Sequence, residues 1–86
     1  MDVTEVKVFP VSDEKLKAYA TITFDASFVV RDLKIIQGKT GYFVAMPSKK
    51  RKDGTYRDMA HPLNMEMRSM IETRVMAEYE KEIGRL

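Results

Sequence analysis

The side chains that point most directly to chemistry in this chain are a dense group of cations: Lys49, Lys50, Arg51, Lys52 and Arg57. Residues 46–57 carry these five positive charges against one negative charge, that of Asp53, so the segment has a net charge of +4. The chain has 15 basic and 13 acidic residues, which leaves 10 against 12, or −2, outside the segment. Because neighbouring cations repel each other and gain nothing from a hydrophobic core, their grouping predicts an anionic partner. Phosphate backbones are the commonest such partner, so the cluster favours nucleic acid.

The cations surround Asp53-Gly54, a dipeptide typical of a hairpin turn because both residues tolerate a positive φ. Residues 42–46 and 55–59 are predicted to be the strands on either side of this turn. Pro47 offers no amide hydrogen to a ladder, so it should end the first strand or lie at a bulge. Such a β-arm suits a DNA major groove or a single-stranded nucleic acid. The alternative is a solvated loop whose lysines only prevent aggregation at a sheet edge.

The residue types needed for catalysis are sparse. The single histidine, His61, stands beside Pro62, and no serine lies in an elbow-like turn nearby, although Asp58 is close enough in sequence to orient the imidazole. The acidic residues near the C-terminus look like a solvated helix face, since no second histidine accompanies them at metal-ligand spacing. The glycines form no phosphate-cradling fingerprint, and cysteine is absent. We therefore expect no catalytic residue, metal site, cofactor or small-molecule substrate, and we interpret His61 as a structural loop residue.

The length of 86 residues predicts one domain, residues 1–86, near the lower limit for an independent hydrophobic core. Its 44% apolar and 33% charged residues are ordinary for a soluble globular protein. No apolar run approaches the roughly 20 residues of a membrane span, and no signal peptide opens the chain. We therefore expect a cytoplasmic location without membrane contact. Because a small core supplies little stability, we also expect a homodimer.

Apolar and β-branched residues predict three strands before the basic segment, at 3–9, 16–25 and 28–36. The second strand has the clearest alternation, with one apolar face and one solvent-exposed face, as in an antiparallel sheet. A turn over residues 37–41 should lead into the next strand. The third strand is predicted to place Val29, Leu33 and Ile35 on one face, with Arg31 in register between them, and Phe28, Val30 and Ile36 on the other.

After His61-Pro62 the apolar period changes from two to 3.6, which predicts a long helix that stops near Gly84. Asn64 is the expected N-cap, and Glu66 places a carboxylate in the first turn. The predicted buried stripe consists of Met67, Ile71, Val75, Tyr79 and Ile83, flanked by Met70 and Ala77. Met65, Met76 and Ile83 lie toward the far side of this stripe and indicate a protein–protein surface.

These elements predict an α+β fold, in which an antiparallel sheet of four to five strands packs against one C-terminal helix. The short connections indicate a meander, from which the hairpin arm projects.

Residues 41–49 read Gly-Tyr-Phe-Val-Ala-Met-Pro-Ser-Lys, and residues 53–62 read Asp-Gly-Thr-Tyr-Arg-Asp-Met-Ala-His-Pro. Together they resemble the signature of the bacterial stage V sporulation protein G family, SpoVG. The similarity runs through nearly the whole chain, including residues 3–6 and 28–32. The resemblance implies a small dimeric α+β protein that binds DNA and RNA and regulates genes, including those for septation, capsule and virulence.

Within this resemblance, Lys49 and Lys50 match the family's basic positions after Met-Pro-Ser, and Arg57 matches its arginine after an aromatic residue. Many relatives have threonine or methionine and then proline before Asp-Gly. This chain has Arg51 and Lys52 there, which adds positive charge to the arm.

The leading hypothesis is a non-enzymatic, homodimeric regulator that binds nucleic acid. The predicted phosphate contacts are Lys49, Lys50, Arg51, Lys52 and Arg57, with Arg31 and Lys34 extending the patch if the third strand lies beside the arm. One alternative is a protein-interaction module whose basic arm docks on an acidic protein partner. Another is a ribosome-associated or general RNA-binding accessory protein.

Three further side chains have two interpretations each. Tyr56 either stacks on a base or makes a cross-strand contact with Tyr42 or Phe43. Arg68 and Arg74 either contact nucleic acid or form ion pairs with Glu72 and Glu78.

Overall fold

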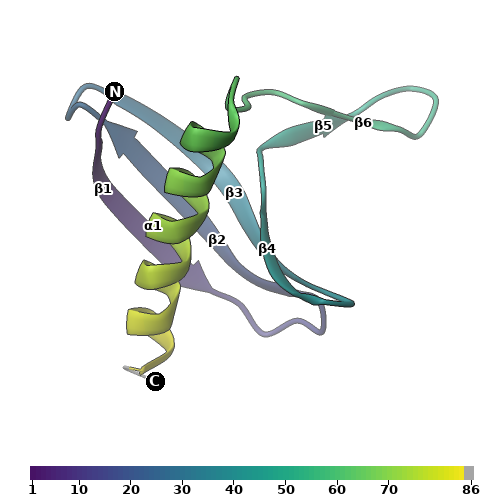
Figure 1. Cartoon of the computed structure of the whole chain (residues 1–86). Helices are drawn as coiled ribbons and strands as arrows, with labels where there is room; N and C mark the ends of the chain where they lie inside the picture. The colour runs from purple at the N-terminus through teal and green to yellow at the C-terminus, as the bar shows by residue number, and fades with distance from the viewer. Residues whose placement is uncertain (85–86) are drawn as a thin grey trace.

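A computed structural model describes residues 1–84 and confirms the α+β fold (Figure 1). Four antiparallel strands form one sheet in the order in which they occur in the chain, which is the predicted meander. The spatial neighbours are β1 (Val3–Pro10), β2 (Leu16–Phe24), β3 (Phe28–Gly38) and β4 (Gly41–Ala45). One helix, α1 (Met65–Gly84), lies across a single face of this sheet.

The arm is a separate two-stranded sheet made of β5 (Ser48–Lys50) and β6 (Tyr56–Asp58). The prediction that residues 42–46 form its first strand is wrong, because β4 pairs with β3 and the chain starts a new strand after Pro47. Pro47 cannot donate to a ladder and therefore separates the two strands, as predicted. The arm projects from the body (Figure 1). It accounts for a radius of gyration of 13.1 Å, compared with about 12 Å expected for a compact chain of this length.

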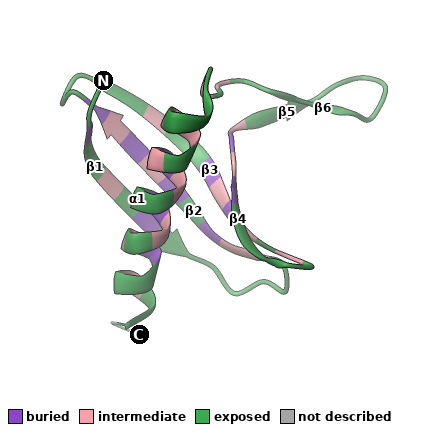
Figure 2. Cartoon of the chain, in the orientation of Figure 1, coloured by how far each residue is buried: buried purple, intermediate pink, exposed green. Residues whose placement is uncertain are grey.

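Helix α1 begins with the predicted cap. The side-chain Oδ1 of Asn64 accepts a hydrogen bond of 2.8 Å from the backbone N–H of Met67, which satisfies one of the free amides of the first turn. Ile71, Val75 and Tyr79 then face the sheet and are buried. They join a buried cluster to which all four strands of the sheet contribute, and β1 is the strand nearest the helix; this layer between helix and sheet is the core (Figure 2).

The apolar stripe of the helix is shorter than predicted. Ile83 is 43% exposed because the last turns of α1 extend past the buried cluster, and Ala77 is also exposed. Met76, expected on a protein–protein surface, packs partly buried against the core, whereas Met65 is 73% exposed. The helix therefore offers less apolar surface than predicted. Within residues 1–84, no helix is long and apolar enough to cross a membrane.

A β-bulge in β3 reverses the predicted sides of its first half. Ala20 of β2 pairs with Leu33 while Ile22 pairs with Val30, so the single residue Thr21 faces two residues of β3. Asp32 has a φ of 65°, the left-handed conformation that such a bulge uses. Because one extra residue changes the alternation, Val30 shares the core side with Leu33, and Val29 is 48% exposed. The predicted grouping of Val29 with Leu33 and Ile35 is wrong.

Candidate nucleic-acid interface

The tip of the arm is a three-residue hairpin loop between Arg51 and Thr55. The N–H of Gly54 donates to the carbonyl of Arg51 at 3.0 Å, and the N–H of Arg51 donates to the carbonyl of Thr55 at 2.6 Å. Gly54 has a φ of 92°, which a residue with a Cβ rarely adopts. The predicted Asp53-Gly54 turn is confirmed, and its type, a turn followed by a left-handed glycine, is common in hairpins.

Asp53 holds this loop through Thr55. One carboxylate oxygen accepts hydrogen bonds from the backbone N–H of Thr55 at 3.0 Å and from its hydroxyl at 2.7 Å. The hydroxyl bond, followed by the backbone bond, lowers the pKa of Asp53 below its ordinary value, since both stabilise the charged form. The only acidic group at the tip is therefore engaged with its own turn.

The lowered pKa predicts a pH dependence of the turn. A carboxylate with a depressed folded pKa contributes its stability above the unfolded pKa and loses it as pH falls through the folded pKa. We expect the turn to be intact at neutral pH and to loosen in acid, below the ordinary range of an aspartate. Two-dimensional NMR should show the amide signals of Gly54 and Thr55 moving together in that range. Asp53→Asn should remove this transition, and an unchanged transition in that variant would contradict the assignment.

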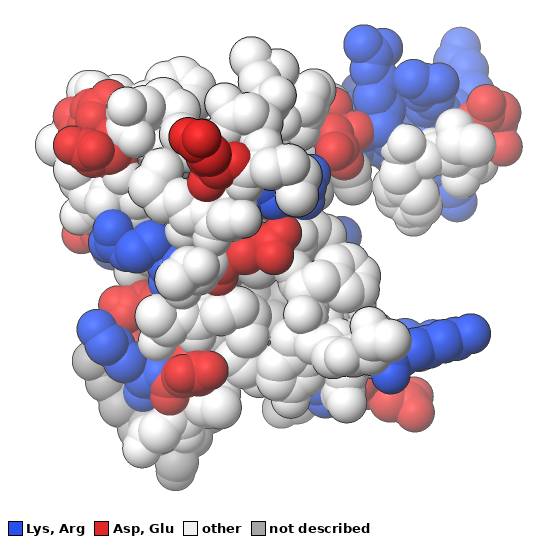
Figure 3. Space-filling model, in the orientation of Figure 1, with Lys and Arg blue, Asp and Glu red and all other residues white. Residues whose placement is uncertain are grey.

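The arm presents its cations to solvent. All five are exposed, and within residues 1–84 none of them forms a salt bridge. Figure 3 shows Lys and Arg gathered on the arm, whereas charges of both signs are mixed over the body. Lys49 lies directly opposite Arg57 in the β5–β6 ladder, so the two cations share one face of the arm. Like charges directly opposite each other destabilise a strand pair.

Tyr56 is 67% exposed and pairs with Lys50. The predicted contact with Tyr42 or Phe43 is wrong, because the arm strand does not border β4. Tyr42 instead packs edge-on against Tyr79 of the helix, with ring centroids 5.9 Å apart. The ring of Tyr56 is therefore available on the arm.

Sequence reasoning missed the position of His61 beside the arm. His61 lines a shallow hollow together with Arg51, Tyr56 and Arg57. Its position in a loop was predicted, but its nearness to the cations depends on how the arm folds back toward the helix. The only sequence signal for a binding site here is the net charge of residues 46–57, and this segment ends before His61.

The structure brings Lys34 to the arm but not Arg31. Lys34 lies opposite Ala45 in the sheet and lines a second hollow with Pro47 and Ser48, at the root of the arm. Asp32 lines the same hollow and offsets part of this charge. Arg31 is exposed at the bulge of β3 and lines neither of the two hollows beside the arm. The predicted patch therefore continues from the arm to Lys34.

The two helix arginines have different roles. Arg68 lies 3.8 Å from Glu72, the predicted ion pair between successive turns. Arg74 does not pair with Glu78 as predicted, since Glu78 lies 3.9 Å from Lys81. The guanidinium of Arg74 donates instead to the carbonyl of Val3 at 2.9 Å, across 71 positions of sequence. This bond ties the helix to β1.

Among the described residues, no three His, Asp or Glu side chains gather in the arrangement of a metal site. The side chains on and beside the arm are cations, a tyrosine, a histidine, short polar groups and the carboxylates of Asp32, Asp53 and Asp58, and the excess of cations suits the binding of a polyanion.

Comparison with known proteins identifies the family of this chain. The family model described as SpoVG matches residues 1–81, which include the whole sheet, the arm and most of α1. The chain belongs to the SpoVG family. The family assignment made from residues 41–62 is thereby confirmed.

Curated members of the SpoVG family align with almost the entire chain. A protein from Bdellovibrio bacteriovorus is 68% identical over 83 residues, covering 96% of this chain and 77% of its own length. One from Anaeromyxobacter sp. strain Fw109-5 is 63% identical over 83 residues, covering 96% of this chain and 86% of its own. One from Caldicellulosiruptor saccharolyticus is 46% identical over 85 residues, covering 98% and 97%. Each of the three is named "Putative septation protein SpoVG".

Proposed function

We propose that this protein is a non-enzymatic regulator that binds DNA and RNA through the phosphate contacts of its β-arm. The observation that carries the proposal is the pairing of Lys49 with Arg57, two cations that face each other without any salt bridge among the described residues. The unliganded arm bears an electrostatic cost that a phosphate between the two side chains would remove. A polyanion is therefore the partner that fits this face best.

The shape of the arm supports the same partner. A two-stranded ribbon is narrow enough for a DNA major groove, and exposed Tyr56 offers a ring on which an unpaired base can stack. Lys34 continues the basic surface from the arm to the sheet. Phosphate contacts fix position and carry no sequence information themselves, so we expect moderate discrimination between sequences.

The names of the relatives support a proposal about the cellular process in which the protein acts. Proteins 46–68% identical to this chain are named for septation. We propose that the chain acts in the same process from the cytoplasm, by binding the nucleic acids of genes that affect division and sporulation.

Lys49→Glu tests this proposal because it should change stability and binding in opposite directions. An opposite-charge pair with Arg57 should replace the repulsion and stabilise the arm by about 0.2–1 kcal/mol. The same change should lower nucleic-acid affinity, since it removes a phosphate contact and adds repulsion. Amide hydrogen exchange of Ser48–Lys50 measures the first effect, and fluorescence anisotropy with a labelled duplex and a labelled RNA measures the second.

Lys50→Glu is the matched control. It makes the same charge change one residue away but faces Tyr56, so it should weaken binding without slowing exchange in the arm. Parent-like affinity in both variants would remove the arm from nucleic-acid binding and favour docking on an acidic protein.

We further propose that the protein is a homodimer. Helix α1 covers one face of the sheet, and no other element within residues 1–84 covers the opposite face (Figure 1). Phe9 and Tyr19 lie opposite each other in neighbouring strands and are 53% and 37% exposed, and Phe43 is 47% exposed. Burying such a surface would add the stability that a small core lacks, and a second copy would duplicate the arm.

Multi-angle light scattering at micromolar concentration should give twice the chain mass of 10.0 kDa. Phe9→Lys together with Phe43→Lys should shift the mass toward that of a monomer without touching the buried core. A monomeric parent protein would contradict the proposal.

A further inference from the structure

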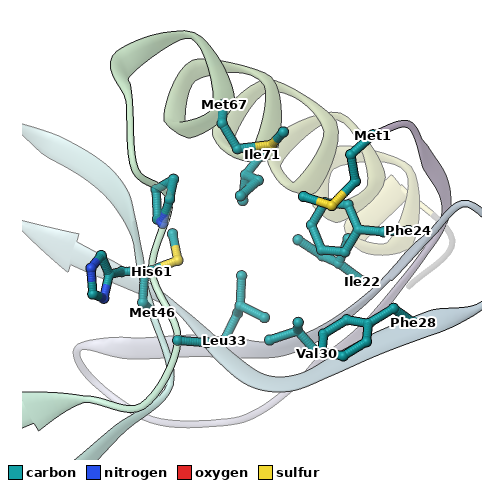
Figure 4. A pocket seen from close by; sticks show the side chains of 12 residues that line it. Met1, Ile22, Phe24, Phe28, Val30, Leu33, Met46, His61, Met67 and Ile71 are labelled. Carbon is teal, nitrogen blue, oxygen red and sulfur yellow. The ribbon is translucent and has the colours of Figure 1, made fainter.

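An apolar hollow of about 180 Å³ lies between the first turns of α1 and the sheet (Figure 4). Its walls come from three parts of the fold. Val30 and Leu33 of β3 form its floor, Met67 of α1 lies above, and Met46 borders the side toward the arm. Pro62 also lines it. Phe28 and Met1 also line it, and they are 65% and 68% exposed, so they mark its open side.

The chemistry of the hollow excludes charged ligands. Among residues 1–84, no charged side chain lines it, and the imidazole of His61 points away from its centre in Figure 4. A charge placed inside would lose its hydration without gaining a partner. Thioethers and aromatic rings, which make favourable sulfur–aromatic contacts, supply much of the wall. In size, the hollow exceeds an apolar protein cavity of about 150 Å³ that stays dry and binds benzene.

The hollow is also where both ends of the arm are anchored. Met46 immediately precedes Pro47, where the chain leaves the sheet for the arm, and the segment 60–62 returns from the arm to the helix. The two ends are joined by a hydrogen bond of 2.7 Å from the N–H of Met59 to the carbonyl of Pro47. A molecule that filled the hollow would contact residues at both ends and restrict the orientation of the arm.

We propose that the hollow is a regulatory site for a small uncharged molecule of about one aromatic ring, whose binding raises the affinity of the arm for nucleic acid. The binding site itself is argued from the lining and the volume, while the regulatory effect rests on the proposed function. The increase arises because an arm held in one orientation loses less conformational freedom when it binds.

The seven methionines provide a direct test, with benzene as the probe. In the full-length protein labelled with ¹³C at the methionine methyls, benzene should shift the signals of Met46 and Met67 saturably. A dissociation constant on the order of 1 mM is expected for so small a ligand. Met65, which is 73% exposed and lies outside the hollow and the arm, should not respond. Benzoate, which has the same ring with a charge, should leave Met46 and Met67 unchanged.

Substitutions at two neighbouring positions distinguish benzene binding in the hollow from nonspecific binding to the surface. Val30→Phe should fill the space and abolish the shifts, whereas Val29→Phe, on the exposed side of the same strand, should preserve them. If Val30→Phe does not fold, Phe28→Ala at the rim serves instead and should weaken benzene binding about three- to tenfold.

Regulation is tested by anisotropy with the labelled duplex and RNA, with and without saturating benzene. We expect affinity to rise about fivefold, and nucleic acid to tighten benzene binding by the same factor, because coupling is reciprocal. If benzene does not shift the methyl signals of Met46 and Met67, the proposal is overturned. The same holds if the shifts are absent because a second copy of the chain fills the hollow. Methyl shifts with unchanged nucleic-acid affinity would overturn the regulatory role.

If the protein binds no nucleic acid at all, the proposed function is wrong. The NMR experiment still tests whether the hollow binds benzene. In that case benzene must also move the arm amides of Ser48–Lys50, and stationary amides would overturn the link between hollow and arm.

Discussion

Replacing Lys49, Lys50, Arg51 and Lys52 together by glutamine should nearly abolish nucleic-acid binding while leaving the fold intact. Each phosphate contact on duplex DNA contributes about −0.9 to the slope of log affinity against log salt. Four to six contacts per arm therefore predict a slope of roughly −4 to −5 for the parent, and the loss of four should flatten it by about 3.6. The affinity at physiological salt should fall on the order of a thousandfold, equally for all sequences.

The fold should survive because these side chains are exposed and the hydrogen bonds of the loop that involve Arg51 use its backbone. Anisotropy at three salt concentrations, with a thermal melt of each variant, measures both effects.

A second quadruple variant makes the same charge change elsewhere on the surface. This variant replaces four exposed lysines of the body by glutamine: Lys7, Lys15, Lys39 and Lys81. Its salt slope should stay close to that of the parent. Equal losses in the two variants would mean that net charge, and not the arm, drives binding. Unchanged binding by the arm variant, together with loss of a protein partner in pull-downs, would establish the rival function as a protein-interaction module.

Tyr79→Ala should cause the largest loss of stability. Its side chain is 6% exposed, lies in the core cluster and packs against Tyr42 with an interplanar angle of 88°. Removing a buried ring costs the transfer free energy and leaves a cavity, together about 3–5 kcal/mol. Because a small domain has a total stability of only about 5–15 kcal/mol, the unfolding midpoint in urea should fall steeply.

Tyr42→Ala is the partner control. Tyr42 is 48% exposed, so its loss should cost much less than that of Tyr79. A double-mutant cycle should give a coupling of about 0.5–1.5 kcal/mol for the edge-on ring pair. Additive effects would show that the two rings merely lie close together. Neither variant should change the salt slope, since neither residue lies on the arm.

The hydroxyl of Tyr79 adds a pH test of the same contact. Burial, and secondarily the nearby Tyr42, raises the pKa of Tyr79 above its ordinary value of 10.0. A group whose folded pKa is raised contributes stability that is fully present below the unfolded pKa and is lost as pH rises through the folded pKa. Urea midpoints of the parent should therefore decline above pH 10, and Tyr79→Phe should reduce that decline.

Much of the arm and the helix could be predicted because their determinants are local in sequence. The Asp53-Gly54 turn is closed by Thr55, two positions away, and the Asn64 cap reaches the amide of Met67, three positions away. Interactions of this range form wherever the residue types occur at the right spacing. The concentration of positive charge is likewise a property of composition, so the candidate cations were found without a structure.

The errors came from choices that depend on distant residues. A strand over residues 42–46 could pair either with β3, which precedes it, or with the arm strand that follows it. The tertiary structure pairs it with β3. This pairing places Val44 in the core and is followed by Met46, which is also buried. The bulge at Asp32 likewise cannot be read from alternation, because an extra residue reverses every side chain that precedes it.

The sequence by itself determined that the chain has an α+β fold, a basic hairpin arm and a capped C-terminal helix, because periodicity, turn chemistry and charge act over a few residues. Only the tertiary structure decided that Lys34 and His61 border the arm, that Arg31 does not, and that Arg74 ties α1 to β1. It also decided that Met46 and Pro62 meet at one apolar hollow. These neighbours are far apart in sequence, and the packing of the helix on the sheet, driven by burial of the core, brings them together.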